Sequence, residues 1–191
     1  MDEAQLREHF CRALNQLWMR GMIVGCDGLL SCEVHRRRYL VTPMGIRRVD
    51  LKPDDLICVD IGGENVQGGE GIPPETWQPH RDAYQTHLDP TGSGLRASAF
   101  IEPAHVLALL GRYDGQPQMD LCCGPVPILD GADAGKVRET LAENTEAVIR
   151  YPNHSGLFVA ATDLPKLLNR IERLDLSAAI QLAGQGQLTT P

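Results

Sequence analysis

The sequence predicts an α/β fold built in layers, on three observations. Short apolar runs typical of strands alternate along the chain with amphipathic segments whose apolar residues recur at helical spacing. The chain has 191 residues and is 42% hydrophobic, which is enough to bury a sizeable core. No internal repeat and no linker-like stretch divides it, so we expect a single domain over residues 1–191.

Several segments carry the apolar spacing of helices together with stop or capping signals. They are 4–20, 76–87, 103–110, 133–145 and a closing helix over 164–182. Thr76 is the expected N-cap of the second, which places Pro79 in a first turn, where proline is tolerated. Thr162 or Asp163 caps the closing helix, and we expect the tail from Gly184 to fray.

The strands are expected in short apolar runs bounded by glycine, proline or charged turns. These runs are 31–34, 39–42, 56–61, 95–102, 125–129, 147–151 and 157–161. The first two form a hairpin whose basic tip, His35 to Arg38, we interpret as a solvated turn and not as a phosphate-binding patch. Pro125 and Pro127 favour an edge strand or an extended segment, because proline has no amide hydrogen to donate.

The segment 95–110 indicates where function should be sought. Its first half reads as a strand buried on both faces, and Pro103 then opens a helix. In α/β proteins, ligands and catalytic groups collect where the carboxyl end of a strand meets a helix N-terminus, because unpaired backbone N–H groups point outward there. Glu102 and His105 occupy this junction, so we expect the functional site beside them.

Composition argues against several classes of partner. A net charge of −7 does not suit a general nucleic-acid or anionic-membrane surface, which needs clustered lysine and arginine. No apolar run reaches the length of a membrane span. The six cysteines show no CxxC spacing, and the N-terminus lacks the charged start and apolar core of a signal peptide, so we expect a cytoplasmic location.

Five turns occur in an order that resembles the class II aldolase/adducin family. They are Gly25-Cys-Asp-Gly-Leu-Leu-Ser31, Thr42-Pro-Met-Gly45, Leu51-Lys-Pro-Asp-Asp55, Trp77-Gln-Pro-His80 and Asn153-His-Ser-Gly156. The similarity covers nearly the whole chain. It implies a three-layer α/β/α sandwich around a central mixed β-sheet, often assembled as a homotetramer, with aldolase (lyase) or epimerase activity on sugar phosphates.

The resemblance also implies a divalent metal site, usually for zinc. The family binds the metal through a His-x-His at a strand end and the histidine of an Asn-His-Gly turn, which leaves a position open for substrate oxygens. The His-x-His falls on Phe100 and Glu102 in this chain, and only His154 matches. A phenylalanine cannot ligate, so zinc or another divalent metal would need Glu102, His154 and a further histidine, His105 or His80.

The substrate-binding and acid/base positions that the resemblance implies are also altered. Gly28, Thr42 and Gly45 match the phosphate-binding turns, but a leucine follows Gly28 and a methionine precedes Gly45, where the family has an asparagine and a serine. The family's glutamate, the general acid/base, falls on Thr76, with Glu75 one residue away. A shift in the register of this proline-rich loop would make Glu75 the base.

Two hypotheses follow. In the first, the catalytic site has been lost and the protein acts as a binding or scaffold domain, as the correlated loss of metal, phosphate and base residues indicates. In the second, a rewired metal-dependent lyase or isomerase uses Glu102, His105 and His154 as ligands and Glu75 as base, on a sugar phosphate or related hydroxy-carbonyl compound. Glu102 and Glu75 also have a structural reading as favourable charges at helix N-termini, and His154 as a hydrogen-bonding residue in its own turn.

Overall fold

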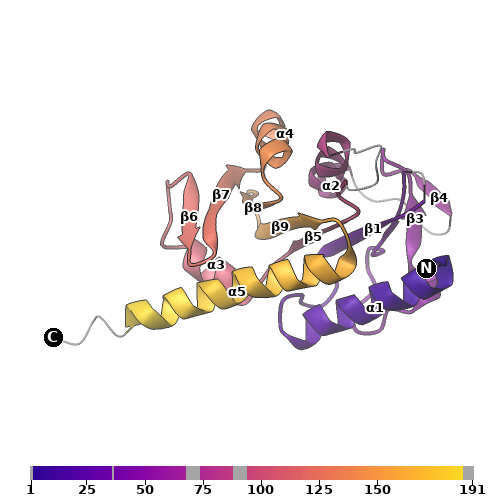
Figure 1. Ribbon diagram of the computed structural model, residues 1–191, viewed down its shortest axis with the longest axis horizontal. Helices are drawn as coiled ribbons and strands as arrows, with labels where there is room; N and C mark the ends of the chain where they lie inside the picture. The colour runs from indigo at the N-terminus through magenta and orange to yellow at the C-terminus, as the bar shows by residue number, and fades with distance from the viewer. Residues whose placement is uncertain (1, 36, 68–73, 88–93, 187–191) are drawn as a thin grey trace.

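Figure 1 shows a computed structural model of the chain, which describes residues 2–35, 37–67, 74–87 and 94–186, with only the backbone described at 67, 74–76, 185 and 186. The described helices are α1 (Glu3–Met19), α2 (Pro74–Thr86), α3 (Ala104–Leu110), α4 (Ala134–Glu143) and α5 (Leu164–Gly186), with a short 3-10 helix at Pro53–Asp55. The described strands are β1 (Leu29–His35), β2 (Arg38–Val41), β3 (Ile57–Val59), β4 (Asn65–Gln67), β5 (Ala97–Ile101), β6 (Gln118–Leu121), β7 (Gly124–Asp130), β8 (Glu146–Arg150) and β9 (Ser155–Ala161).

The described strands form one mixed sheet in the order β4-β3-β2-β1-β5-β9-β8-β7-β6. Neighbouring strands are antiparallel except β7 and β8, which run parallel. β5, in the middle of the sheet, is buried along its whole length, as the sequence predicts. The registers set Leu29 beside Phe100 and Phe100 beside Phe158, so the start of β1, the end of β5 and the start of β9 meet at one end of the sheet.

Helices cover both faces of the sheet (Figure 1). α1, α3 and α5 lie against one face, where their apolar residues form a large core with strand residues such as Leu30, Ala99 and Val159. α2 and α4 lie against the other face, where Trp77 and Phe158 are fully buried. The predicted α/β class, with helices on both sides of a mixed sheet, is therefore confirmed.

Side-chain caps fix the starts of the long helices. Asp2 accepts a hydrogen bond from the N–H of Gln5, and the Gln5 side chain accepts one from the N–H of Asp2. Asp163 Oδ1 accepts the N–H of Lys166 at 2.8 Å, so of the two residues that the sequence suggested, Asp163 caps α5. Such caps each stabilise a helix by about 1 kcal/mol. None of the described helices combines the length and the apolar character that a membrane span requires.

Two helix boundaries differ from the prediction. α2 begins at Pro74, so Thr76 lies inside the helix instead of capping it, and Pro79 lies beyond the first turn. Pro74 explains the earlier start, because proline has the φ angle of the first helical position and no N–H that would need an acceptor there. α5 continues through Gly184, where we expected fraying, because its apolar stripe packs against the core as far as Leu182.

The strand that contains Pro125 and Pro127 is not at the edge of the sheet. β6, which the sequence pattern did not indicate, pairs with it on one side and β8 on the other. Ile128 donates its N–H to the Pro117 carbonyl beside β6, and N–H groups alternate along a strand, so both proline nitrogens face the side of β8. β8 pairs only from Ile128 onward, and the prolines therefore remove no hydrogen bond from the sheet.

Candidate functional site

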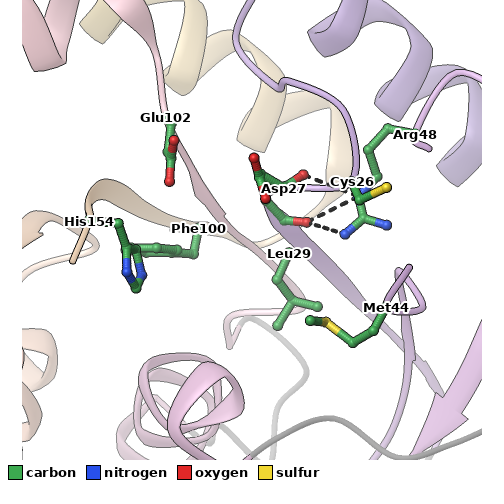
Figure 2. Close-up of a pocket in the computed structure, with 9 residues that line it drawn as sticks. Cys26, Asp27, Leu29, Met44, Arg48, Phe100, Glu102 and His154 are labelled. Carbon is green, nitrogen blue, oxygen red and sulfur yellow. Dashed lines mark hydrogen bonds between the residues drawn. The ribbon is translucent and has the colours of Figure 1, made fainter. Parts of the chain in front are cut away.

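A cavity of about 440 Å³ opens at the end of the sheet where β1 starts and β5 ends. It is lined by Cys26, Asp27, Gly28, Leu29, Met44, Arg48, Phe100, Glu102 and His154. Leu29, Met44 and Phe100 supply apolar surface, while Glu102 and His154 lie on the opposite wall from Met44 (Figure 2). Residues from four separate stretches of the chain thus meet at this one point.

Arg48 holds together the two turns that form one wall of the cavity, and Figure 2 shows its hydrogen bonds to the first of them. Its guanidinium is almost fully buried and donates to the carbonyl oxygens of Asp27 and Gly28 in one turn and of Pro43 and Ile46 in the other, at 2.7–3.2 Å. Burial lowers the pKa of Arg48 below its ordinary value. Among the described residues it has no carboxylate within ion-pair distance, so its direct partners are carbonyl oxygens.

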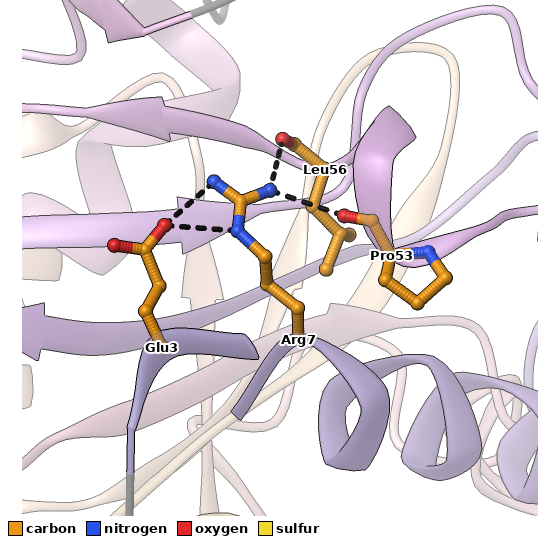
Figure 3. A network of polar contacts seen from close by, with 4 residues as sticks. All are labelled: Glu3, Arg7, Pro53 and Leu56. Atoms are coloured by element: carbon orange, nitrogen blue, oxygen red, sulfur yellow. Dashed lines mark hydrogen bonds and ion pairs between the residues drawn. The ribbon is translucent and has the colours of Figure 1, made fainter. Parts of the chain in front are cut away.

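A second arginine joins two segments in a similar way, but with an anionic partner (Figure 3). Arg7 of α1 donates to the carbonyl oxygens of Pro53 and Leu56, at 3.1 and 2.9 Å, and its guanidinium also pairs with Glu3 at 2.8 Å. Arginine therefore has a structural role at both places, and the difference is that Arg48 lacks the carboxylate that Arg7 has.

Gly28 and Gly45, two of the predicted substrate-binding residues, adopt left-handed conformations in these turns, with φ of +78° and +75°. Gly28 lines the cavity, and a Cβ there would lie 3.4 Å from the carbonyl oxygen of Phe100. Conformation and close approach both favour glycine at this position. The third, Thr42, is buried, and its Oγ1 accepts the N–H of Leu30 at 3.2 Å, which ties β2 to β1.

Glu102 directly follows β5 and lines the cavity. Partial burial raises the pKa of its carboxyl, the nearby Asp27 carboxylate raises it further, and His154 lowers it. The three groups therefore lie close enough to interact electrostatically. Glu102 keeps its proton to a higher pH than an ordinary glutamate, which is a property that general acids and bases share.

His154 lies in the turn between β8 and β9. Its ring stacks on that of Tyr151, with centroids 4.9 Å apart and planes at 19°, and meets the ring of Phe100 edge-on at 6.0 Å and 81°. The N–H of Tyr151 donates to the carbonyl oxygen of His154 at 2.8 Å, which closes the turn. Two aromatic rings thus pack against the imidazole, which stays exposed at the cavity wall.

Phe100 stands where the resemblance implies a metal-binding histidine. Its ring lies on the backbone of Gly156, so close that a Cβ at Gly156 would overlap the ring. Tyr151 meets the same ring edge-on, with centroids 5.9 Å apart. The phenyl group therefore fills the space between Gly156, Tyr151 and His154 and offers no donor atom to a metal.

The structure does not bring His105 to the cavity. His105 lies in the first turn of α3, and its Nδ1 is 2.8 Å from Oδ2 of Asp175, a buried residue of α5. This pair joins the two helices. Glu75, the predicted base, lies in the first turn of α2 by its backbone, and its side chain is outside the described residues.

His80 is buried in a polar network between α2 and the sheet. Its Nδ1 lies 2.8 Å from the hydroxyl of Ser98 and 3.0 Å from that of Ser31, which is also 2.8 Å from the hydroxyl of Tyr84. The imidazole stacks on Trp77 with centroids 5.6 Å apart. Burial lowers the pKa of His80 to about 3, so the ring is neutral and its hydrogen bonds hold α2 against β1 and β5.

The donor groups at the cavity do not fit the zinc site that the resemblance implies. Zinc in proteins takes at least three nitrogen, sulfur or oxygen ligands from side chains. Across the described part of the chain, no three His, Cys, Asp or Glu side chains are arranged to hold a metal ion. Glu102 and His154 remain at the implied position, and two ligands hold zinc weakly.

The sequence did not single out Asp27 or Arg48 as site residues. Asp27 lies between Cys26 and Gly28 in the first glycine-rich turn. Its position beside Gly28, which the structure shows to be left-handed, was the signal that the sequence offered. Arg48 had no such signal. Its role depends on carbonyl oxygens as far as 21 residues away in sequence, and backbone acceptors leave no trace in the residue types.

A second cavity, of about 540 Å³, adjoins the first, because Glu102 and His154 line both. Arg150 lines this second cavity, where its guanidinium lies 3.2 Å from the carboxylate of Asp114 and donates to the Leu110 carbonyl at 3.3 Å. Glu102 and His154 thus lie between two cavities, which are lined by different residues on their other sides.

Comparison with known proteins gives one family. The sequence pattern described as the class II aldolase and adducin N-terminal domain matches residues 8–182. A curated relative, the 5-methylthioribulose-1-phosphate/5-deoxyribulose-1-phosphate aldolase of Rhodospirillum rubrum, is 32% identical over 107 residues. That match covers 56% of this chain and 46% of the relative, so it spans about half the length of that protein.

Solved structures share the fold at low sequence identity. L-fuculose-1-phosphate aldolase from Thermus thermophilus has a TM-score of 0.76 at 22% identity, over 99% of this chain and 100% of that one. An aldolase II superfamily protein from Pseudomonas syringae has a TM-score of 0.79 at 18% identity, over 97% of this chain and 78% of that one. At these identities the likeness establishes the fold and leaves the chemistry to be argued from the site.

Proposed function

Because this chain belongs to the class II aldolase and adducin family, we propose that it is a binding or scaffold domain of that fold that has lost the family's metal-dependent lyase chemistry. In this proposal the cavity beside Glu102 and His154 holds a small molecule without cleaving it. The domain then acts through what it binds.

The observation that carries the proposal is the position of Phe100. Its ring packs on Gly156 and meets the ring of His154 edge-on. An open coordination position needs space and at least three donors, and here an apolar ring takes up that space. Gly156, which has no side chain, leaves the room that the ring occupies.

The lining of the cavity supports the same proposal. Leu29 and Met44 line it at the positions where the resemblance implies an asparagine and a serine. Their apolar side chains replace two groups that would hydrogen-bond a phosphate. Charge-assisted hydrogen bonds are the main source of phosphate affinity, so the cavity has lost much of its ability to hold a phosphorylated sugar.

The alternative is a rewired lyase or isomerase that acts on a sugar phosphate or a related hydroxy-carbonyl compound. The observation that favours it is the carboxyl of Glu102, whose pKa is raised beside Asp27 and His154. A carboxyl of this kind can hold a proton and release it to a substrate oxygen. Glu75 would be the second acid/base group in this alternative.

A cytoplasmic location and assembly into a homo-oligomer, a tetramer by resemblance, are further proposals. Neither depends on the state of the cavity. Both concern the fold, which the chain shares with the aldolases named above.

An assay for carbon–carbon bond cleavage tests the proposed function. The protein is incubated, with and without added Zn²⁺, with fuculose 1-phosphate and with 5-methylthioribulose 1-phosphate, and the carbonyl products are measured. We expect no release above that of a His154→Ala variant. Zinc-dependent cleavage that disappears in His154→Ala would overturn the proposal in favour of the lyase.

A further inference from the structure

The cavity beside Glu102 carries more negative than positive charge. Its ionisable lining includes two carboxyl groups, Asp27 and Glu102, one guanidinium, Arg48, and the imidazole of His154. Two acidic groups against one basic group leave a formal charge of −1 when the imidazole is neutral. A phosphate would add to this negative charge, whereas a cation would balance it.

Arg48 is not available to bind an anion. Its guanidinium donates to four carbonyl oxygens of the turns that build the cavity wall, so turning it toward a ligand would break those contacts. Asp27 lies near enough to favour the charged form of Arg48, so these two charges offset each other. Glu102 then has no ion-pair partner in the described lining, where the imidazole of His154 is the group that favours its ionised form.

Within the described residues, the carboxyl of Glu102 is also free of hydrogen bonds. No side chain in that part of the chain donates to it, although burial and the neighbouring Asp27 make its ionised form unfavourable. A partly buried carboxylate without a donor is less well stabilised than one in water, and a ligand that brings an N–H or a positive charge offsets that penalty. His154, which lines the same cavity, has its ring held by Tyr151 and Phe100.

Next to the acidic side lies an apolar surface. Leu29, Met44 and Phe100 face the same cavity, and Leu29 and Phe100 are neighbours across the β1–β5 pair. The side chain of Met44 is half-exposed at 53%, which is unusual for a large apolar residue and leaves it accessible at the opening. A cavity with an acidic side and an apolar side suits a ligand with a cationic head and an apolar body.

We propose that this cavity binds a small primary amine, with its ammonium group at the carboxylate of Glu102 and near Asp27, and its apolar body against Leu29, Met44 and Phe100. The inference rests on the proposed function, which supplies the cavity as a binding site, and adds the chemistry of the ligand. It also explains why leucine and methionine stand where a phosphate-binding family has polar residues.

The test uses three compounds that share one body and differ in charge: benzylamine, benzyl alcohol and benzyl phosphate. Each is titrated into the protein at pH 7.5 and low ionic strength, and binding is followed by ligand-observed NMR or calorimetry. We expect benzylamine to bind at least tenfold more tightly than benzyl alcohol, and benzyl phosphate to bind more weakly than both. Equal affinities, a preference for the phosphate or no binding of the amine would overturn the inference.

Two variants locate the site. Glu102→Gln keeps the shape of the side chain and removes its charge, so it should weaken benzylamine at least tenfold and leave benzyl alcohol unchanged. Glu139→Gln changes an exposed residue of α4 and should leave both affinities unchanged. An amine affinity that Glu102→Gln does not change would contradict the inference, because the ammonium group would then bind elsewhere.

The two proposals fail in different experiments. If benzylamine shows no preference and no bond cleavage is detected, the inference about the ligand is wrong, but the proposal of a binding domain is unaffected. Zinc-dependent cleavage of a sugar phosphate removes the binding-domain proposal, and the ligand inference falls with it because it rests on that proposal.

Discussion

The ring of Phe100 lies directly on the backbone of Gly156, with no room for a Cβ at that glycine. The two residues belong to adjacent strands, β5 and β9, and Gly156 is buried. A side chain larger than hydrogen at position 156 would overlap this ring, which also meets the ring of His154 edge-on. Phe100 and Gly156 therefore form a matched pair that gives the candidate site its shape.

The matched pair predicts a coupled response to mutation. Gly156→Ala should lower the free energy of unfolding by about 1–3 kcal/mol, the usual effect of overpacking a core. Shortening the ring with Phe100→Leu should relieve the clash, so the double variant should be more stable than the sum of the single effects predicts, by at least about 0.5 kcal/mol. Urea unfolding of the four proteins measures this coupling, and additive effects would show that the two side chains do not compete for space.

Arg48 should be far more important for stability than its sequence neighbour. Arg48→Met leaves four carbonyl oxygens of two turns without their donor, and we expect a loss of at least about 2 kcal/mol, because a buried acceptor left unpaired costs about 1–3 kcal/mol. Arg47 is exposed and lies 3.5 Å from Asp50, so the matched Arg47→Met should cost less than about 1 kcal/mol. Denaturant unfolding measures both variants. Similar losses of unfolding free energy in Arg48→Met and Arg47→Met would contradict the role of Arg48 in joining the two turns.

His80 should make the protein sensitive to acid. Its pKa is about 3 in the folded state and about 6.5 in an unfolded chain, so the unfolded state binds the proton first as the pH falls. Stability due to the neutral ring is complete above pH 6.5 and is lost progressively between pH 6.5 and 3, by about 2 kcal/mol at pH 5.

The His80→Gln variant isolates this effect, because an amide does not titrate. Urea unfolding at pH 7 and pH 5 should show a loss for the unmutated protein about 2 kcal/mol larger than for His80→Gln. The variant is expected to be less stable at pH 7, since its side chain cannot reproduce the stacking on Trp77. Equal pH-dependent losses in the two proteins would mean that other groups cause the acid sensitivity.

Glu102 should change the stability in the opposite direction to His80 as the pH falls. Burial, with Asp27 adding to it, raises the pKa of Glu102 in the folded state, so the folded protein holds this proton more tightly than the unfolded chain does. Its contribution to stability is therefore unfavourable above the folded pKa and improves as the pH falls through that pKa. Glu102→Gln should raise the melting temperature at pH 7.5, with a smaller difference at pH 5. A lower melting temperature at pH 7.5 would show that the carboxylate has a stabilising partner.

The elements in the middle of the fold could be predicted from the sequence alone. The buried segment 95–102 and the helix after Pro103 follow from hydrophobic pattern and proline chemistry, which are local properties. β6 was missed because it is only four residues long, in which exposed polar and buried apolar residues alternate, and this is too short to be recognised as a strand pattern. The two prolines of its pairing partner, β7, also hid the pair. Of the two readings given to the segment with Pro125 and Pro127, the edge strand was wrong, because β6 pairs with β7 on its outer side.

The candidate site was predictable only in part. Glu102 and His154 stand at strand ends, which is a signal in the sequence, and both line the cavity. The direction of His105 was not predictable, because it depends on Asp175, which lies 70 residues away in α5. Arg48 was missed because its partners are backbone carbonyl oxygens, and a buried arginine without a carboxylate has no counterpart in the sequence to look for.

We propose that this site has an apolar ring, that of Phe100, where the family has a metal-binding histidine. This replacement can be reversed by design, since Phe100 and Glu102 stand where the family's two histidines are implied and His154 matches the third. The double variant Phe100→His/Glu102→His would place three imidazoles around the position that the ring fills. Adding His154→Ala to it removes one ligand and provides the matched control.

The most direct test is the zinc content of the purified proteins after soaking in zinc and dialysis, measured by elemental analysis. We predict that the unmutated protein keeps well below one zinc per chain, that Phe100→His/Glu102→His keeps about one, and that the variant carrying His154→Ala as well loses it again. About one zinc retained by the unmutated protein, and lost in its His154→Ala variant, would contradict the account, because the site would then hold a metal with Phe100 in place.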